Sequence, residues 1–121
     1  MRALLDTTVI IDYLNGVSAA KREILLYAEP MLSIVTWMET LAGTSTDDQR
    51  DVREFLSSFQ VVPLDGPVAA AAVRARQELR LKLPDAIVWA TALELNVPLV
   101  TRNSKDFDPK HPLVRIPYRL T

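Results

Sequence analysis

The segment that decides the fold is RALLDTTVIIDYLNG, residues 2–16. It opens with a short apolar run that stops at Asp6, and apolar residues at mixed spacing follow until Asn15 and Gly16 interrupt them. A short apolar run indicates a buried strand, and the longer segment before the Asn-Gly pair indicates a helix. The opening therefore predicts a β-strand that ends at Asp6, followed by a helix.

The rest of the chain repeats this alternation of strand and helix. Helical spacing, helix-forming composition and turn residues predict helices over residues 18–29, 36–42, 52–59, 67–81 and 84–95, with Gly43 closing the second. Apolar runs predict strands over residues 31–35, 61–62 and 97–101, with an edge strand over 114–116. Short apolar strands separated by helices pair in parallel beneath helices on both faces. We therefore expect a doubly wound, three-layer α/β/α sandwich around a mainly parallel sheet of four to five strands.

The amino-acid composition limits the kinds of functional site that this fold can contain. With 121 residues, 49% of them hydrophobic, the chain has the length of one domain, residues 1–121. The absence of cysteine excludes disulfides, cysteine zinc sites and thiol nucleophiles, and a single histidine excludes a histidine-built metal site. Any metal must therefore bind to oxygen. A net charge of -1 gives no overall basic field, so nucleic acid would need a local basic patch or bound cations.

The N-terminus gives no sign of targeting to a membrane. Asp6 comes too early for the apolar core of a signal peptide, and no apolar run approaches the ~20 residues that span a bilayer. We expect a cytoplasmic protein without a membrane partner.

Four carboxylates fall where such a sheet forms its ligand site, which is outside the carboxyl ends of the strands. Asp6 ends the first strand, and Glu39 lies one helical turn beyond the second. Asp85 lies in the first turn of a later helix, and Asp106 follows the strand over residues 97–101. We therefore expect the fold to gather these four acids in one pocket.

Carboxylates in one pocket repel one another unless a cation neutralises them. Mg²⁺ and Mn²⁺ prefer oxygen ligands, and Mg²⁺ keeps waters that leave positions for a phosphate oxygen and an attacking hydroxide. The chemistry implied is metal-assisted hydrolysis of a phosphodiester.

Each acid also has a plain structural alternative. Asp6 fits a helix N-cap, Asp85 fits a carboxylate that complements a helix dipole, and Asp106 with Asn103 fits a turn. Glu39 is harder to dismiss, because its mostly apolar segment predicts a buried face on which a lone Glu needs a partner. Asp12, four residues after Thr8, fits a solvated helix carboxylate better than a direct ligand on the face it shares with Thr8.

Taken together, four segments resemble the PIN-domain family, and within it the small VapC-type toxins of type II toxin–antitoxin systems. The similarity spans nearly the whole chain, and the joint order of the segments is more specific than any one of them. They are LLDTTVIIDYL (4–14), Ser33 to Gly43 around Glu39, KLPDAIVWATA (82–92) and LVTRNSKDF (99–107).

The resemblance implies a Mg²⁺- or Mn²⁺-dependent endoribonuclease with a PIN-like fold, neutralised by a small cognate antitoxin, and a homodimer. Asp6 and Asp85 match the principal metal-binding aspartates of the family, Glu39 matches its helical acid and Asp106 its fourth acid. The catalytic and metal residues expected are thus Asp6, Glu39, Asp85 and Asp106. Thr8 and Asn103 are auxiliary, since the family more often has Asn or Ser at the former and sometimes Asp at the latter.

An RNA substrate and an antitoxin both need a surface. The predicted phosphate contacts are Arg80, Lys82, Arg102 and Lys105, which flank Asp85 and Asp106. A solvated helix face explains Arg74 and Arg76 equally well. The apolar residues of the first two helices suggest a groove for an antitoxin helix, with core packing as the alternative; they are Val9, Ile10, Tyr13, Leu14, Leu25 and Leu26.

Three other functions compete with this one. A catalytically silent PIN-like binding module would keep the acids without turnover. A receiver-type phosphoacceptor domain normally pairs adjacent acids after its first strand, whereas Asp6 stands alone there. A DNA nuclease of the flap-endonuclease type would need more acids and additional helices than this chain supplies.

Overall fold

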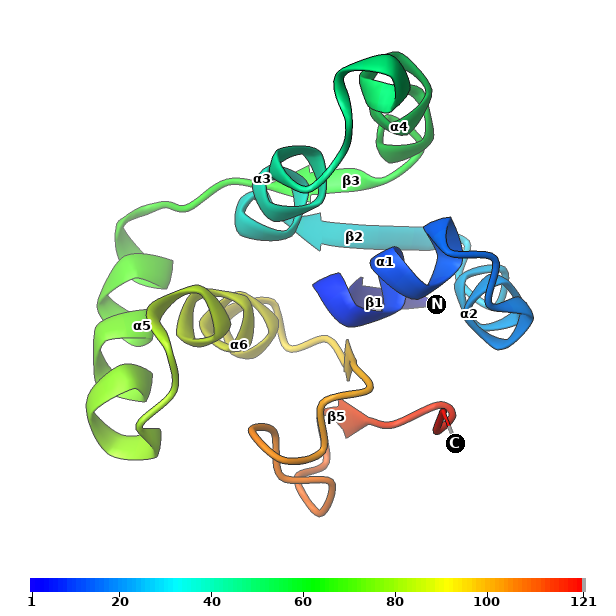
Figure 1. The fold of residues 1–121 in the computed structure, drawn as a ribbon. Helices are drawn as coiled ribbons and strands as arrows, with labels where there is room; N and C mark the ends of the chain where they lie inside the picture. The colour runs from blue at the N-terminus through cyan, green and yellow to red at the C-terminus, as the bar shows by residue number, and fades with distance from the viewer. Residues whose placement is uncertain (121) are drawn as a thin grey trace.

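The sheet and its helices are described by a computed structural model for residues 1–120 (Figure 1). The strands are β1 (Arg2–Leu5), β2 (Glu29–Ser33), β3 (Gln60–Val62), β4 (Leu99–Val100) and β5 (Val114–Arg115). The helices are α1 (Thr7–Leu14), α2 (Ser18–Ile24), α3 (Ile34–Ala42), α4 (Gln49–Leu56), α5 (Gly66–Leu79) and α6 (Leu83–Leu95), with a 3₁₀ turn, η1, at Thr46–Asp48. None of the helices in this part of the chain is long and apolar enough to cross a membrane.

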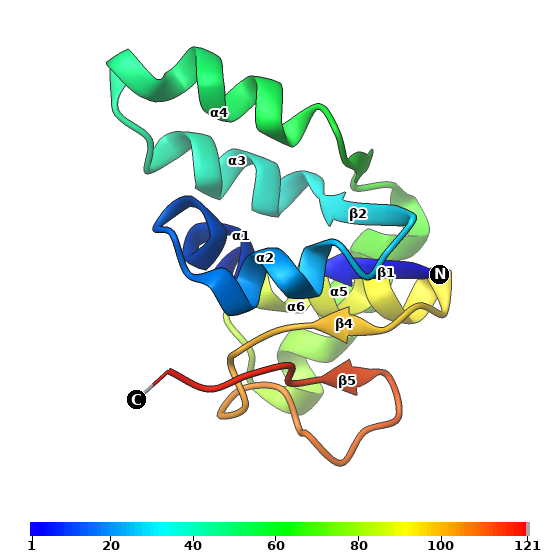
Figure 2. The ribbon, with the colours of Figure 1, turned by 90° about the vertical axis from the view of Figure 1, so that its right-hand side faces the viewer.

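All five strands are parallel, in the order β3-β2-β1-β4-β5. Figure 2 shows the arrows of β1, β2, β4 and β5 pointing to the same side of the molecule. From β1 the chain builds outward through β2 and β3, and it then crosses to the other side to add β4 and β5. The order therefore reverses beside β1, which is where open parallel sheets place their ligand crevice.

Side chains of the central strands alternate between two apolar layers. Leu4 and Met31 pack with α5 and α6, while Leu5 and Leu32 pack with α1 to α4. A strand buried on both faces needs apolar residues at successive positions, and the sequences of the central strands β1 and β2 have this pattern. The predicted α/β/α sandwich with a parallel sheet is confirmed.

Local sequence signals fix the starts of α3, α5 and α6. Ser33 caps α3, because its hydroxyl accepts a hydrogen bond of 3.1 Å from the backbone N–H of Val35. Asp65 caps α5 in the same way through the N–H of Val68 at 3.0 Å. In α6, Pro84 occupies the first turn, where no backbone donor is needed.

The structure corrects several predicted boundaries. Helix α2 ends at Ile24, not at Glu29, and the chain turns there before β2 begins. Pro30 therefore lies inside β2, at a position before the residues that pair with β3. The predicted strand over residues 31–35 is also too long at its C-terminal end, since capping by Ser33 starts α3 at Ile34. Strand β4 has two residues where five were predicted.

Candidate functional site

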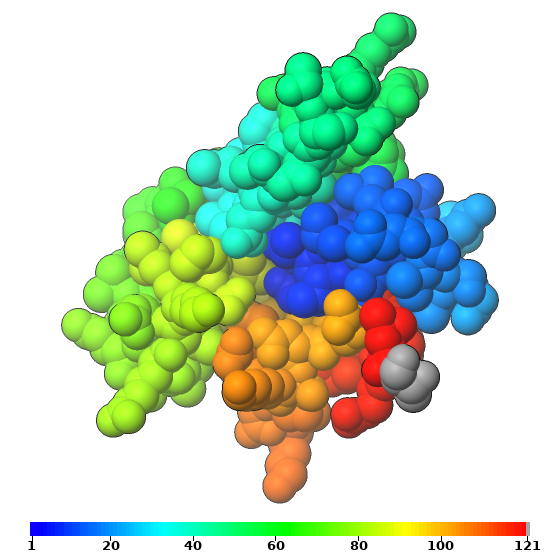
Figure 3. All heavy atoms as spheres, viewed as in Figure 1, coloured from blue at the N-terminus to red at the C-terminus, as the bar shows by residue number. Residues whose placement is uncertain are grey.

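Segments far apart in sequence meet at the carboxyl end of β1. In Figure 3 the surfaces of α1, α3, α6 and the segment after β4 come together at one place. A cavity of about 290 Å³ lies there, and three of the four predicted acids line it: Asp6, Glu39 and Asp85. The other lining residues are Thr7, Thr8, Ile11, Arg102 and Asn103. We call this hollow the carboxylate cavity.

The pKa of Asp85 reflects the burial and the negative charge at this cavity. The pKa of its carboxyl is raised from 3.8 to about 6, chiefly by burial and then by the charges of Asp6, Asp106 and Glu39, in that order. The charge of Lys82 acts in the opposite direction and is the smallest contribution. Asp106 therefore lies close enough to act on Asp85 electrostatically, although it does not line the carboxylate cavity.

Asp6 is the most enclosed of the four acids, with 3% of its surface exposed. It lies between β1 and α1, and its Oδ2 accepts hydrogen bonds from the hydroxyls of Thr8 at 2.9 Å and Thr101 at 2.7 Å. Both donors orient the carboxylate without neutralising it. Thr8, predicted as auxiliary, thus contacts the acid directly, and Thr101 is a further contact that the sequence did not single out.

Glu39 corrects one expectation. It was predicted on a buried face, but it is exposed, because Thr36, Thr40 and Leu41 form the buried face of α3. Its carboxylate accepts a hydrogen bond of 3.0 Å from the hydroxyl of Thr7 at the start of α1. Glu39 therefore lies at the open side of the carboxylate cavity.

Asn103 and Asp106 pair with each other in the segment after β4. The Asn103 amide donates to Asp106 Oδ2 at 3.0 Å, and the Asp106 backbone N–H donates to Asn103 Oδ1 at 3.2 Å. Asn103 lines the carboxylate cavity, whereas Asp106 lines a neighbouring hollow of about 220 Å³ with Trp89 and His111. Of the two, Asn103 is therefore the one that faces the other acids.

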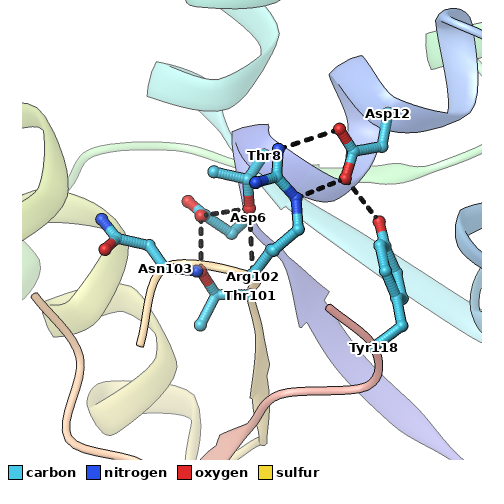
Figure 4. Close-up of polar contacts among 7 residues, drawn as sticks. All are labelled: Asp6, Thr8, Asp12, Thr101, Arg102, Asn103 and Tyr118. Carbon is cyan, nitrogen blue, oxygen red and sulfur yellow. Dashed lines mark hydrogen bonds and ion pairs between the residues drawn. The ribbon is translucent and has the colours of Figure 1, made fainter. Parts of the chain in front are cut away.

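Asp12 contradicts its interpretation as a solvated carboxylate, since only 4% of it is exposed. Arg102 donates to it through Nε at 2.7 Å and Nη2 at 3.0 Å, and the Tyr118 hydroxyl donates to its Oδ2 at 2.8 Å (Figure 4). The hydrogen bond to Asp12 raises the pKa of Arg102, and burial followed by the bond to Asp12 raises the pKa of Tyr118. No local sequence signal joins these three residues.

Three of the predicted phosphate contacts, Arg80, Lys82 and Lys105, are exposed and do not line the cavity. Arg80 follows α5 in a left-handed conformation (φ 58°), and Lys82 is the residue directly before α6. Lys105 lies in the loop that carries Asp106. Arg102 lines the cavity itself, with its guanidinium already held by Asp12. The role of all four in RNA binding stays a prediction.

The proposed antitoxin groove needs a correction. Val9 and Ile10 have no exposed surface and belong to the core beneath α1. Leu25 and Leu26 are exposed at 72% and 53%, and Leu25 lines a hollow of about 400 Å³ together with Tyr13. The apolar surface that remains available is therefore carried by the turn after α2 and its surroundings.

The donor atoms present at the carboxylate cavity are those that a hard dication prefers: carboxylates, hydroxyls and one amide. As the side chains stand, no group of three or more His, Cys, Asp or Glu among residues 1–120 is arranged to hold a metal ion. The donor chemistry and the mutual repulsion fit a metal, while the ligand distances would have to form on binding. The metal role of these acids stays a prediction.

Comparison with known proteins agrees with this architecture. Ribonuclease VapC1 of Methanocaldococcus jannaschii is 29% identical over 113 residues, which cover 88% of this chain and 79% of that protein. A chain of a toxin–antitoxin complex from Klebsiella pneumoniae is 38% identical with a TM-score of 0.91, covering 98% of this chain and 99% of its own. A chain of the DNA-bound VapBC structure from Salmonella typhimurium shares the fold, with 24% identity, a TM-score of 0.79 and 98% of each chain covered.

The family model described as PIN domain matches residues 3–109. That range includes β1 from its second residue, β2 to β4, and all four acids of the candidate site. Because the match spans most of the chain, and because the fold agrees with that of the similar toxin–antitoxin chain, this protein belongs to the PIN domain family.

Proposed function

We propose that this chain is a Mg²⁺- or Mn²⁺-dependent endoribonuclease and the toxin of a type II toxin–antitoxin pair. The observation that carries the proposal is the carboxylate cavity, where burial and three neighbouring acids raise the pKa of Asp85 to about 6. Charge gathered in this way is costly to the fold unless a bound cation or a reaction requires it.

The residues proposed to hold the metal are Asp6, Glu39 and Asp85, with Asp106 beside them. A bound dication would supply Lewis-acid chemistry, acidifying a water and stabilising the leaving oxygen of a phosphodiester.

The residues of the chain itself prepare the site. Thr8 and Thr101 both bond Oδ2 of Asp6, which fixes the carboxylate plane and leaves Oδ1 for a ligand. Asp85 is ionised at neutral pH, since its pKa is about 6. Arg102 and Lys82 bring positive charge toward the phosphate of an RNA strand that approaches the carboxylates.

The names of two similar proteins support the toxin assignment. One is a ribonuclease, and the other is a chain of a toxin–antitoxin complex. The exposed apolar side chains Leu25 and Leu26 offer surface for a cognate antitoxin helix, and the family resemblance suggests a homodimer. A toxin that cleaves cellular RNA would act in the cytoplasm.

The test is cleavage of single-stranded RNA by purified protein with added Mg²⁺ or Mn²⁺, with single-stranded DNA offered in parallel. The variants are Asp6→Asn and Asp85→Asn, and the matched control is Asp47→Asn, an exposed acid in η1 outside the cavity. The proposal expects metal-dependent RNA cleavage by the wild type and Asp47→Asn only. Equal cleavage by all four proteins would reject the carboxylate cavity as the site.

A lack of RNA cleavage by any of the proteins would favour the silent binding module. Cleavage of DNA alone would favour a DNA nuclease. The discriminating observation in both cases is made on the wild-type protein before any variant is compared.

A further inference from the structure

We propose that Asp12 and Tyr118 are positioning residues, which hold the Arg102 guanidinium at the edge of the carboxylate cavity ready to bind a phosphate of single-stranded RNA. This inference rests on the proposed function and extends it to the C-terminal tail. Asp12 and Tyr118 do not line the cavity, so they would act through Arg102.

Arg102 is the one cationic side chain among the residues that line the cavity. Its Nε and Nη2 donate to the two oxygens of Asp12, and this bidentate pair leaves Nη1 for another acceptor. The side chain is 34% exposed, so the guanidinium reaches solvent. A planar, always charged fork of this kind suits recognition of phosphate oxygens.

Both ends of Arg102 are fixed relative to Asp6. Its backbone N–H donates to the Thr8 hydroxyl at 3.1 Å, and the same hydroxyl donates to Asp6 Oδ2. Its guanidinium is held by Asp12 on α1, the helix that begins directly after Asp6. Arg102 is therefore fixed relative to Asp6, and little side-chain freedom is left to lose when a phosphate binds.

Tyr118 completes the arrangement from the tail. In Figure 4 its ring reaches from the tail to Asp12, on the side of the carboxylate away from Asp6. Its hydroxyl donates to Asp12 Oδ2, the oxygen that also accepts from Arg102 Nε. The tyrosine lies outside residues 3–109, the range matched by the PIN domain model. The donor therefore comes from the tail, beyond the matched part of the chain.

The chain offers a matched control. Glu23 is a second buried carboxylate held by an arginine and a tyrosine: Arg115 donates through Nε at 2.6 Å and Nη2 at 2.9 Å, and the Tyr27 hydroxyl donates at 2.6 Å. None of these three residues lines the carboxylate cavity. Tyr27→Phe therefore removes the same kind of hydrogen bond as Tyr118→Phe, but at a place without a role in RNA binding.

The first measurement concerns the hold on Arg102 without RNA. In a ¹H–¹⁵N spectrum of the full chain, the Arg102 Nε–H signal, assigned by its loss in Arg102→Gln, should be sharp and slow to exchange. Tyr118→Phe should broaden it or speed its exchange several-fold, and Tyr27→Phe should leave it unchanged. An Arg102 signal that is unaffected by Tyr118→Phe would overturn the positioning role.

The second measurement is affinity for a fluorescein-labelled oligo(U) RNA 12-mer in EDTA, followed by anisotropy between 50 and 200 mM NaCl. Arg102→Gln should reduce the slope of log K against log salt by about 0.7, the value for one lost phosphate contact on a single strand. Tyr118→Phe and Asp12→Asn should weaken binding about 3- to 10-fold, the equivalent of roughly one hydrogen bond. Tyr27→Phe should bind as the wild type does.

Thermal melting of each variant checks that it is folded, and Tyr118→Phe keeps the ring that packs in the tail. If Arg102→Gln and Tyr118→Phe bind the 12-mer like the wild type, the inference is wrong even where the wild type cleaves RNA. If their binding falls as expected but the wild type cleaves no RNA, the inference stands and the proposed nuclease function fails.

Discussion

The protein contains two kinds of carboxylate, which differ in whether an arginine pairs with them. Asp12 and Glu23 are buried, and each is held by an arginine and a tyrosine hydroxyl. The acids of the carboxylate cavity and the adjacent Asp106 make no ion pair among residues 1–120, and they receive only hydroxyl and amide donors. The two buried carboxylates are each paired with an arginine from a distant segment of the chain.

The comparison shows how the carboxylate cavity differs from the two buried ion pairs. An arginine beside Asp6 or Asp85 would relieve the repulsion but would also occupy the position of a metal ion. The chain instead orients Asp6 with Thr8 and Thr101, and no ion pair is formed with Asp6 or Asp85 among residues 1–120. Residues that raise the energy of a fold in this way are characteristic of functional sites.

The largest effect is expected from a substitution of Asp6, one of the acids of the carboxylate cavity. Asp6→Asn keeps the size and the hydrogen-bonding ability of the side chain but removes a proposed metal ligand. RNA cleavage should fall by more than about 100-fold, the upper end of the loss caused by outer-shell changes at metal sites. Initial rates at saturating Mg²⁺ measure it, with Asp47→Asn as the control. A loss below threefold would contradict the role given to Asp6.

The paired carboxylates should behave in the opposite way. Arg115→Gln leaves Glu23 buried without its cation, so the free energy of unfolding should fall by about 2 kcal/mol. Because Glu23 lies outside the cavity, the cleavage rate of the folded protein should stay within twofold of the wild type. Urea unfolding and an activity assay at 25 °C measure the two quantities. A stable but inactive Arg115→Gln protein would show that the two regions are coupled.

The pH dependence of stability should separate the two regions further. The pKa of Asp85 in the folded protein, about 6, is above its ordinary value of 3.8, so folding favours its protonated form. Stability from Asp85 is therefore present below about pH 4 and is lost as the pH rises through 6. The pKa of Glu23 is lowered, chiefly by its hydrogen bond to Arg115, so its stabilisation is present above pH 4.5 and is lost as the pH falls through the folded value.

The Asp85 contribution is isolated by comparing the metal-free wild type with Asp85→Asn. Between pH 4 and 7 the wild type should lose about 1 kcal/mol relative to the variant, a value reduced from the full pKa shift because the cavity is open to solvent. Urea unfolding at steps of half a pH unit measures the difference. Parallel curves for the two proteins would mean that Asp85 is not strained by its neighbours.

The sequence predicted the fold and the position of the acids because those depend on local and periodic signals. Asp6 follows an apolar strand, and Asp85 follows a proline that opens a helix, so their places at the carboxyl ends of the sheet come from the order of the elements. The exposure of Glu39 was missed because its apolar neighbours suggested a buried face, whereas threonines form that face of α3.

The contacts that hold the C-terminal segment against the rest of the protein could not be predicted from the sequence. Tyr118 is 106 residues from Asp12, and Arg115 is 92 residues from Glu23. Their contacts depend on the exact path of the chain after β5, which no periodicity or capping rule determines. The early end of α2 has a similar origin, since pairing of β2 with β1 from Glu29 onward overrides local helix propensity.

The central claim is that the carboxylate cavity is built for a divalent cation, and calorimetric titration of the metal-free protein with Mn²⁺ tests it most directly. The wild type should bind Mn²⁺ with proton release that is larger at pH 6 than at pH 7.5, because the metal displaces the proton of Asp85. Asp85→Asn should lose most of that affinity and the pH dependence with it. Equal Mn²⁺ binding by the wild type and Asp85→Asn would contradict the account.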